Sequence, residues 1–108
     1  IGYGTGFYNT TGSLNTYLGR AAGKNNTTGN NNLFLGYESG RNNLIGSNNV
    51  FIGYQSGYDE TGSNKLYVDN SSSDSPLIYG DFDVDSLQIN GKLNINGAFN
   101  FPTADGTA

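Results

Sequence analysis

A repeat with a period of 17 residues constrains this chain more than any other feature of its sequence. Residues 15–19, 32–36 and 49–53 match at that spacing, and each segment begins with Asn and ends with Gly around an apolar run. A fourth copy, residues 65–69, follows one residue early and ends in Asp69. Glycines recur in register at residues 6, 23, 40 and 57. Agreement in several independent columns predicts a repeat architecture in which each copy forms one structural unit.

Each copy contains only one short apolar run, and Asn, Thr, Ser and Gly surround it. A run of about four residues with alternating character suits a β-strand and is too short for a helix. The surrounding residues tolerate the left-handed backbone conformations that tight corners need. The pattern therefore predicts an all-β fold, with a β-solenoid of about 17 residues per coil over residues 1–68. Its coils would stack about 4.8 Å apart.

The composition predicts that such coils do not form an ordinary globular core. Leu, Ile, Val and Phe together supply 24 of the 108 residues, while Gly alone supplies 17. A chain this poor in large apolar side chains can still form a thin core that several copies share. His, Cys, Trp and Met are absent, which excludes disulfides, thiol nucleophiles, His-based catalysis and the usual zinc sites. We therefore expect no cofactor.

The distribution of charged residues limits the classes of partner that we expect. The net charge is −4, with +2 over residues 1–58 and −6 over residues 59–108, and no basic patch is present. We therefore expect no nucleic-acid partner. No apolar stretch is long enough to cross a membrane, so we expect no membrane insertion in this segment. The sequence does not begin with Met and Ile1 falls inside a repeat, so we interpret it as a piece of a longer protein.

Alternation divides each strand into two faces, and both faces are apolar. We expect the aliphatic set to form the core within one chain; its members are Leu18, Leu33, Leu35, Val50, Ile52, Leu66 and Val68. We expect the aromatic set to pack against other copies of the chain, because its exposure would leave a large apolar patch. Its members are Tyr17, Phe34, Phe51 and Tyr67. The alternative is that the aromatic column lies inside a wide single-chain coil.

The chain changes character after the fourth copy. Residues 69–76 are a polar linker that ends at Pro76, and we expect residues 77–108 to form a slender β region that leads to a further C-terminal part. A six-residue repeat there places apolar residues at alternate positions, which predicts short strands. One thin apolar strip is too little for an independent core, so we expect interwound chains to bury it. The residues of this interchain core are Leu87, Ile89, Leu93, Ile95, Phe99 and Phe101.

One side chain in each copy directly follows the strand glycine, and these side chains are candidate binding residues. They are Tyr3, Arg20, Tyr37 and Tyr54. Stacked coils would align them as an exposed ladder of flat groups, suited to sugar rings or to a protein receptor. The alternative is that they only cover the corners of the coils.

Three alternating carboxylates are the one group that we consider for a metal. On a strand, Asp81, Asp83 and Asp85 would share a face and could bind Ca²⁺. An EF-hand loop is excluded, because Ser86 stands where that loop needs Gly and Lys92 stands where it needs Glu. We therefore expect a solvated acidic face and assign no metal.

The repeat resembles the head repeats of YadA-type trimeric adhesins, whose coils carry an Asn, an alternating aliphatic run and then Gly. The matching segments are residues 32–36 and 49–53, with Ser39 and Ser56 three residues after each Gly. The resemblance implies a homotrimer of left-handed parallel β-rolls, with the aromatic set at the trimer axis. This chain differs from the family in its longer coil, and in having Phe or Tyr where small residues usually face the partner subunits.

The C-terminal part, from residue 64 to residue 97, is similar to a junction in long fibre proteins of Bacteroidetes-type bacteria and their phages. That junction often precedes a chaperone domain that drives trimerisation, so the similarity implies an interwound triple-β fibre region here. We expect a structural and adhesive, non-enzymatic segment of a homotrimeric extracellular fibre on a virion, injection particle or bacterial cell. Our first hypothesis is a tail fibre of a phage or of a phage-tail-like contractile injection particle. Such a fibre attaches to a surface glycan or protein. The alternatives are a cell-surface trimeric autotransporter-like adhesin and a fibre-borne polysaccharide depolymerase.

Overall fold

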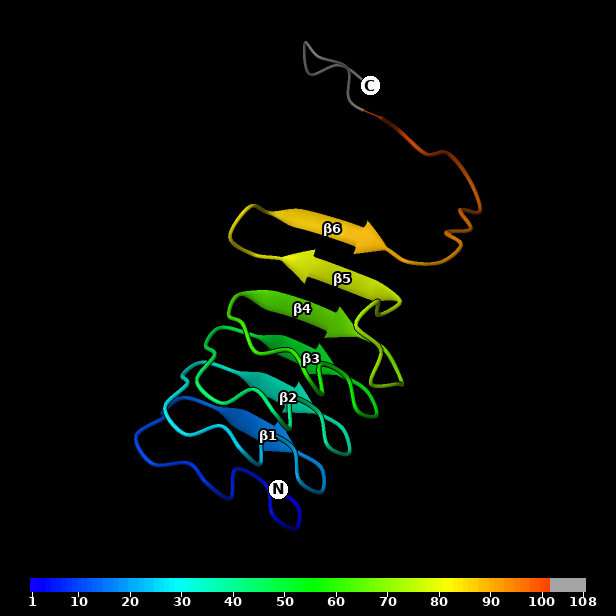
Figure 1. Ribbon diagram of the computed structural model, residues 1–108. Helices are drawn as coiled ribbons and strands as arrows, with labels where there is room; N and C mark the ends of the chain where they lie inside the picture. The colour runs from blue at the N-terminus through cyan, green and yellow to red at the C-terminus, as the bar shows by residue number, and fades with distance from the viewer. Residues whose placement is uncertain (102–108) are drawn as a thin grey trace.

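In the computed structural model the chain forms one mixed β-sheet of six strands, and the structure describes residues 1–101 (Figure 1). The strands follow the chain order across the sheet: β1 (Thr16–Leu18), β2 (Leu33–Leu35), β3 (Val50–Ile52), β4 (Lys65–Val68), β5 (Ile78–Asp81) and β6 (Ser86–Ile89). The predicted all-β class is confirmed. Over residues 1–101 no helix is long and apolar enough to cross a membrane. Residues 102–108, the end of the expected slender region, lie outside the described residues.

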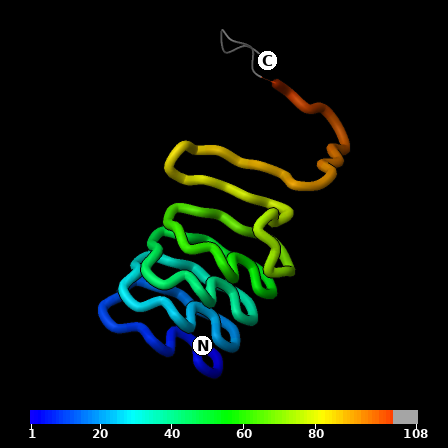
Figure 2. Tube along the Cα trace, viewed as in Figure 1, coloured from blue at the N-terminus to red at the C-terminus, as the bar shows by residue number. Residues whose placement is uncertain are grey.

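Strands β1 to β4 are parallel, and their register reproduces the sequence repeat. Phe34 in β2 pairs with Tyr17 in β1 on one side and with Phe51 in β3 on the other. The missing residue of the fourth copy does not disturb this register, because Phe51 still pairs with Tyr67 in β4. The chain therefore makes one coil between successive strands, and the coils stack on one another (Figure 2). The predicted strand in each copy is confirmed.

Hydrogen bonds join neighbouring coils outside the strands as well. The amide of Gly23 donates to the carbonyl of Ser39 in the next coil at 2.9 Å. A buried Asn column makes the same link with side chains: Asn32 Oδ1 accepts from the Asn49 amide at 3.0 Å, and Asn32 Nδ2 donates to the Gly46 carbonyl at 2.8 Å. Because buried polar groups need partners, these contacts hold each coil in register with the next.

The aromatic set lies inside the coils. Phe34 and Phe51 are both 0% exposed within the single chain. Their ring centroids are 4.8 Å apart with 6° between the planes, and Tyr17 stacks on Phe34 at 5.0 Å. Tyr67 meets Phe51 edge-on at 5.1 Å. The prediction that Tyr17, Phe34, Phe51 and Tyr67 pack at a trimer axis is therefore wrong, and the alternative of a wide single-chain coil is correct.

Glycine makes room for these rings. In the first three strands, each aromatic residue is followed six residues later by a glycine. A Cβ atom at Gly40 would lie 2.6 Å from the Phe34 ring, and one at Gly57 would lie 2.4 Å from the Phe51 ring. Each ring therefore spans the coil interior, with its faces against the rings of neighbouring coils and one edge against glycine. The ring spacing follows the strand spacing of about 4.8 Å, at which stacked rings touch.

The aliphatic set points to the outer face of the sheet. Leu18 and Leu35 are 43% and 36% exposed, although their aromatic neighbours are buried. The prediction that this set forms the intrachain core is therefore wrong for Leu18, Leu33, Leu35, Val50, Ile52, Leu66 and Val68. The reason is the two-residue period of a strand: when the rings occupy the interior, the residues between them must face outward.

The sheet continues beyond the coils as an antiparallel hairpin. β5 pairs with β4 and β6 pairs with β5, so Tyr79 extends the aromatic column at 5.6 Å from Tyr67. The expected linker, residues 69–76, is the loop that reverses the chain, and its last residue, Pro76, is buried. Residues 87–89 of the six-residue repeat lie in β6, but residues 93–95 and 99–101 are not in strands. A strand needs a hydrogen-bonded neighbour, and within the described chain the pairing beyond β6 ends with the hydrogen bond from the Asn90 amide to the Leu77 carbonyl, 2.9 Å long.

Burial of the tyrosine rings predicts a loss of stability in alkali. Burial raises the pKa of Tyr17 to about 12, and burial together with the Glu60 carboxylate raises the pKa of Tyr67. Below the ordinary tyrosine pKa of 10.0 the folded and unfolded chains both keep these protons, so the two phenols do not make the free energy of unfolding depend on pH. Between pH 10.0 and about 12 the unfolded chain loses protons that the folded chain keeps, and the free energy of unfolding falls.

We therefore expect the urea midpoint to decrease over this pH interval, and to decrease less when Tyr17 and Tyr67 are both replaced by Phe. Tyr54→Phe, which removes an exposed phenol, is the control and should follow the wild type. An equal decrease in the double variant and the wild type would contradict the assignment of these two rings to the interior.

Tight stacking also predicts that one glycine column does not accept a methyl group. A Cβ atom on Gly46 would lie 2.1 Å from the carbonyl oxygen of Gly62 in the next coil. Gly62 holds the same place in the last coil, where its Cβ atom would meet nothing closer than Glu60 Oε2 at 3.2 Å. We expect Gly46→Ala to lower the free energy of unfolding by about 1–3 kcal/mol, because the coils must separate, and Gly62→Ala to change it little. Urea unfolding followed by circular dichroism measures both, and equal effects would count against close contact of the coils here.

Candidate functional site

The outer face of the sheet is the first candidate interaction surface, and we call it the apolar sheet face. The strand registers align its side chains in two rows that cross all six strands. One row contains Thr16, Leu33, Val50, Leu66, Gly80 and Leu87. The other row contains Leu18, Leu35, Ile52, Val68, Ile78 and Ile89. None of these residues is charged, and all except Gly80 are half-buried or exposed, so the face is apolar along its whole length.

Apolar exposure continues past the sheet. Leu93, Phe99 and Phe101 are 64%, 58% and 75% exposed. Large contiguous apolar patches on a soluble chain mark interaction surfaces. The residues expected in an interchain core are all half-buried or exposed in the single chain: Leu87, Ile89, Leu93, Ile95, Phe99 and Phe101. Their burial between chains stays a prediction.

The side chains that follow the strand glycines form one column, which we call the Tyr/Arg ladder (Tyr3, Arg20, Tyr37 and Tyr54). The guanidinium carbon of Arg20 lies between two rings, 5.9 Å from the centroid of Tyr3 and 5.7 Å from that of Tyr37. Arg20 Nη1 also donates to the Tyr37 hydroxyl at 3.1 Å. Tyr54 stacks on Tyr37 at 5.3 Å with 8° between the planes. The structure thus brings the four residues together at the spacing of the coils, and their role in binding stays a prediction.

Stacking limits what this ladder can bind along its length. The flat faces of Arg20 and Tyr37 are covered by their neighbours, so the middle of the ladder offers mainly edges to solvent. A sugar ring that packs on an aromatic face would find one only at the two ends, where Tyr3 and Tyr54 are 82% and 52% exposed. The contacts within the ladder meanwhile join adjacent coils. The geometry therefore favours a corner-covering role for Arg20 and Tyr37 in the middle of the ladder.

A second column lies four residues further along each coil, and we call it the cationic ladder (Phe7, Lys24, Arg41 and Tyr58). Arg41 lies 5.8 Å from the Tyr58 ring centroid, and its Nη1 is 2.6 Å from Glu38 Oε1. Gln55 Nε2 donates to Glu38 Oε2 at 2.9 Å. Glu38 is 8% exposed, so its carboxylate lies buried between a cation and an amide. Sequence reasoning missed this column, although its spacing of 17 residues is visible in the sequence.

The three alternating aspartates do not share a strand face. Only Asp81 belongs to β5, while Asp83 and Asp85 lie in the turn to β6. The hydrogen bond from Lys65 Nζ to Asp81 Oδ2, 2.9 Å long, raises the pKa of Lys65 and lowers that of Asp81. Asp83 accepts from Asn64 Nδ2 at 3.1 Å. The expectation of one acidic strand face is wrong because the hairpin turns here, and within residues 1–101 no group of three metal-ligating side chains could hold a metal ion.

The acidic residues of the coils make local contacts. Glu38 binds Arg41, Asp59 Oδ1 accepts from Asn42 Nδ2 at 2.8 Å, and Glu60 Oε1 accepts from the Tyr67 hydroxyl at 3.0 Å. These contacts give the depolymerase alternative no support. The expectation that this segment is not an enzyme stays a prediction.

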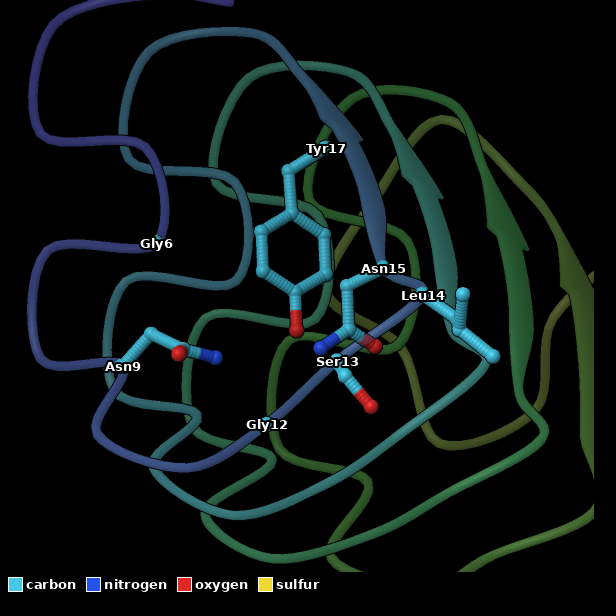
Figure 3. Close-up of a pocket in the computed structure, with 7 residues that line it drawn as sticks. All are labelled: Gly6, Asn9, Gly12, Ser13, Leu14, Asn15 and Tyr17. Atoms are coloured by element: carbon cyan, nitrogen blue, oxygen red, sulfur yellow. The ribbon is translucent and has the colours of Figure 1, made fainter.

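A cavity of about 290 Å³ lies at the open end of the first coil (Figure 3). Tyr17 projects into it from β1, and Asn9 and Asn15 also line it. The equivalent residues of the next coil are buried, because the first coil covers them; they are Asn26, Asn32 and Phe34. The cavity is therefore the cross-section of a coil seen at the end of the stack, rather than a shaped ligand site.

No protein-family model matches this chain, and no curated protein or solved structure matches it. The resemblance to YadA-type adhesins therefore depends on the repeat motifs alone.

Proposed function

We propose that this chain is a structural and adhesive segment of a homotrimeric extracellular fibre, with the apolar sheet face of each copy turned toward the other two. One observation carries the proposal: two uncharged rows of side chains cross all six strands and face outward. Each fibre chain would be a left-handed β-solenoid of about 17 residues per coil.

Further copies of the same chain fit this face. Its side chains repeat at the strand spacing of about 4.8 Å, and another copy carries the same side chains at the same spacing. Parallel copies around a common axis therefore bring aliphatic residues together in every layer. The number three comes from the resemblance to YadA-type heads. With the rings inside each coil, smaller aliphatic side chains face the partners, which is closer to the pattern of that family.

The apolar residues after β6 support the same assembly. Leu93 and Phe99 are exposed and belong to no strand in the single chain. Three chains wound around each other would give each of them a neighbour, as an interwound triple-β region requires. Such a fibre resists unfolding, because removing one chain exposes the aliphatic rows of all three.

The role of such a segment is to hold a receptor-binding end away from a particle or cell. The similarity of the C-terminal part to fibre junctions favours a tail fibre of a phage or of a phage-tail-like contractile injection particle. The YadA-type repeat favours the alternative, a cell-surface trimeric autotransporter-like adhesin. In both cases the partner outside the assembly is a surface glycan or a surface protein.

Sedimentation equilibrium of the 108-residue chain tests the proposal. We expect a species with three times the chain mass of 11.5 kDa at micromolar concentration. A folded monomer under those conditions would overturn the proposal, because the apolar sheet face would then be stable in water.

A further inference from the structure

The Tyr/Arg ladder ends inside the chain, and its last ring is Tyr54. One face of this ring is covered, because Tyr54 stacks on Tyr37 at 5.3 Å with 8° between the planes. The opposite face points toward the fourth copy of the repeat, where Asn70 holds the equivalent place. That copy passes directly over Gly53, since a Cβ atom there would collide with the Asp69 carbonyl oxygen. An Asn side chain is too small to cover a phenol ring, and Tyr54 is 52% exposed, so the ladder ends in a ring with an open face.

The backbone hydrogen bonds between coils also stop at this corner. Each earlier ladder carbonyl accepts from an amide of the next coil; the Tyr37 carbonyl, for example, accepts from the Gln55 amide at 2.8 Å. The Tyr54 carbonyl has no hydrogen-bond partner within residues 1–101. The Asn42 amide likewise donates to the next coil at 3.0 Å, whereas the Asp59 amide, one coil later, donates to none of the described residues. Backbone polar groups need partners, and Tyr54 and Asp59 are both exposed, so these two groups are available to a ligand.

A tight turn brings these groups to the same corner of the coil. A backbone hydrogen bond of 3.1 Å from the Tyr58 amide closes the turn over residues 55–58, and Tyr54 and Asp59 flank it. Asp59 Oδ1 accepts from Asn42 Nδ2 at 2.8 Å, which holds the carboxylate against the neighbouring coil. Its Oδ2 has no partner among the described residues. We call this pair of residues, with the open face of the Tyr54 ring, the coil-end site.

The chain around the coil-end site is acidic. Residues 54–76 contain one base, Lys65, and four acids, which are Asp59, Glu60, Asp69 and Asp74. Lys65 is already paired with Asp81 at 2.9 Å. An anionic ligand would therefore be repelled. A neutral sugar fits better, because its hydroxyl groups donate to a carboxylate and its C–H groups pack on an aromatic face.

We propose that the coil-end site binds a neutral sugar unit of a surface polysaccharide. The sugar ring packs on the open face of Tyr54, and its hydroxyl groups donate to the Asp59 carboxylate and to the Tyr54 carbonyl. This inference deepens the attachment role proposed above and rests on it. Neither residue belongs to the apolar sheet face, so the site remains available in the trimer. A trimer carries the site once on each chain, and a polysaccharide that repeats the same sugar can occupy more than one of them.

The test is a nuclear magnetic resonance titration of the ¹⁵N-labelled 108-residue chain with the trisaccharides of galactose, glucose and mannose. The matching uronic acid trisaccharides are the charged comparison probes. We expect shifts of the Tyr54 and Asp59 amides with at least one neutral trisaccharide, and binding at least about tenfold weaker for its charged counterpart. No shift with any of the three neutral probes would overturn the proposal. Equal binding of the charged counterpart would overturn the assignment of a neutral sugar.

Substitutions of the ring locate the site. Tyr54→Ala should weaken binding of the neutral trisaccharide by at least about tenfold, because the stacking face is lost. Tyr54→Phe keeps that face and should retain most of the affinity. Tyr8→Ala removes a ring of the same exposure, 52%, from the first coil, and it should leave binding unchanged. Equal affinities of Tyr54→Ala and Tyr8→Ala would overturn the role of the Tyr54 ring.

A second pair of variants tests the carboxylate. Asp59→Asn should weaken binding by about tenfold, the usual effect of losing a hydrogen bond to a charged group. The Asn side chain keeps an oxygen that accepts from Asn42, so the coil contact is retained. Asp85→Asn makes the same change of charge in the turn between β5 and β6, and it should leave binding unchanged. Equal affinities of these two variants would overturn the assignment of the Asp59 carboxylate to the site.

Sedimentation of each variant separates this inference from the proposed function. A trimer that binds no neutral trisaccharide would overturn the inference and leave the fibre role standing. A monomer that binds one would overturn the trimer and leave the coil-end site standing.

Discussion

Replacing Phe51 with alanine is expected to unfold the coils under conditions in which the wild-type chain is folded. Phe51 is fully buried, between Phe34 at 4.8 Å and Tyr67 at 5.1 Å. Removing a buried phenyl ring costs about 3–5 kcal/mol, out of a total stability of about 5–15 kcal/mol for a domain. The hydrogen bonds between coils keep the backbone spacing fixed, so the coils cannot close the cavity.

Tyr54→Ala is the matched control, because Tyr54 lies three residues further along the same coil and is 52% exposed. The Tyr54→Ala variant loses the stacking on Tyr37, and we expect its free energy of unfolding to fall by less than about 1 kcal/mol. Urea unfolding followed by circular dichroism, at one fixed chain concentration, measures both variants. If Phe51→Ala shifted the midpoint no more than Tyr54→Ala, the rings would not form the core of the coil.

Replacing Leu35 and Ile52 together with aspartate is expected to dissociate the trimer while each chain keeps its coils. Both side chains lie in one row of the apolar sheet face and point away from the rings. Each substitution removes about 1.5–3 kcal/mol of apolar burial per chain and places a carboxylate against two neighbouring carboxylates. We expect the dissociation constant to rise by at least about a thousandfold, which corresponds to about 4 kcal/mol.

The matched control changes the same residue types elsewhere. Leu44 and Ile45 are 52% and 67% exposed in a turn outside the sheet, so Leu44→Asp with Ile45→Asp adds the same charge and removes the same side chains. Sedimentation equilibrium should find a trimer for this control and a monomer for the first pair, both with circular dichroism of a folded chain. A first pair that remains trimeric would show that the apolar sheet face is not the contact between copies.

The positions of the strands were predictable from the sequence. The 17-residue period places Phe34 beside Tyr17 and Phe51, and the structure has this register. The flanking Asn and Gly residues predict the corners, because these residue types adopt the backbone angles that corners require; Asn31 and Asn48, for example, have φ of 58° and 61°. These features depend on residues close together in the chain or on matches between copies, and both can be read without coordinates.

The choice of inner face was predicted wrongly. Phe34 and Leu35 are adjacent and apolar, so alternation separates them without saying which one lies inside. The signal that would have decided it is Gly40, six residues after Phe34, whose missing side chain leaves room for the ring. Gly23 and Gly57 repeat that signal for the neighbouring coils, and it has meaning only when the two walls of a coil are known to face each other.

The aspartate turn was missed for a related reason. Asp81 continues β5, but Asp83 and Asp85 follow in a hairpin turn that depends on pairing between β5 and β6. Alternation alone cannot distinguish a longer strand from a strand that ends at a turn. The contact between Arg41 and Glu38 could not be expected either, because it depends on how the turn after β2 folds back on itself.

By itself, the sequence determined the period, the strands, the corners and the two apolar faces of the sheet, because repeated residue types impose the same local conformation in every copy. The tertiary structure decided which face lies inside and how the chain reverses after β4. Those outcomes depend on the width of a coil and on contacts across it. Both are properties of the closed coil, so no single strand or turn contains them.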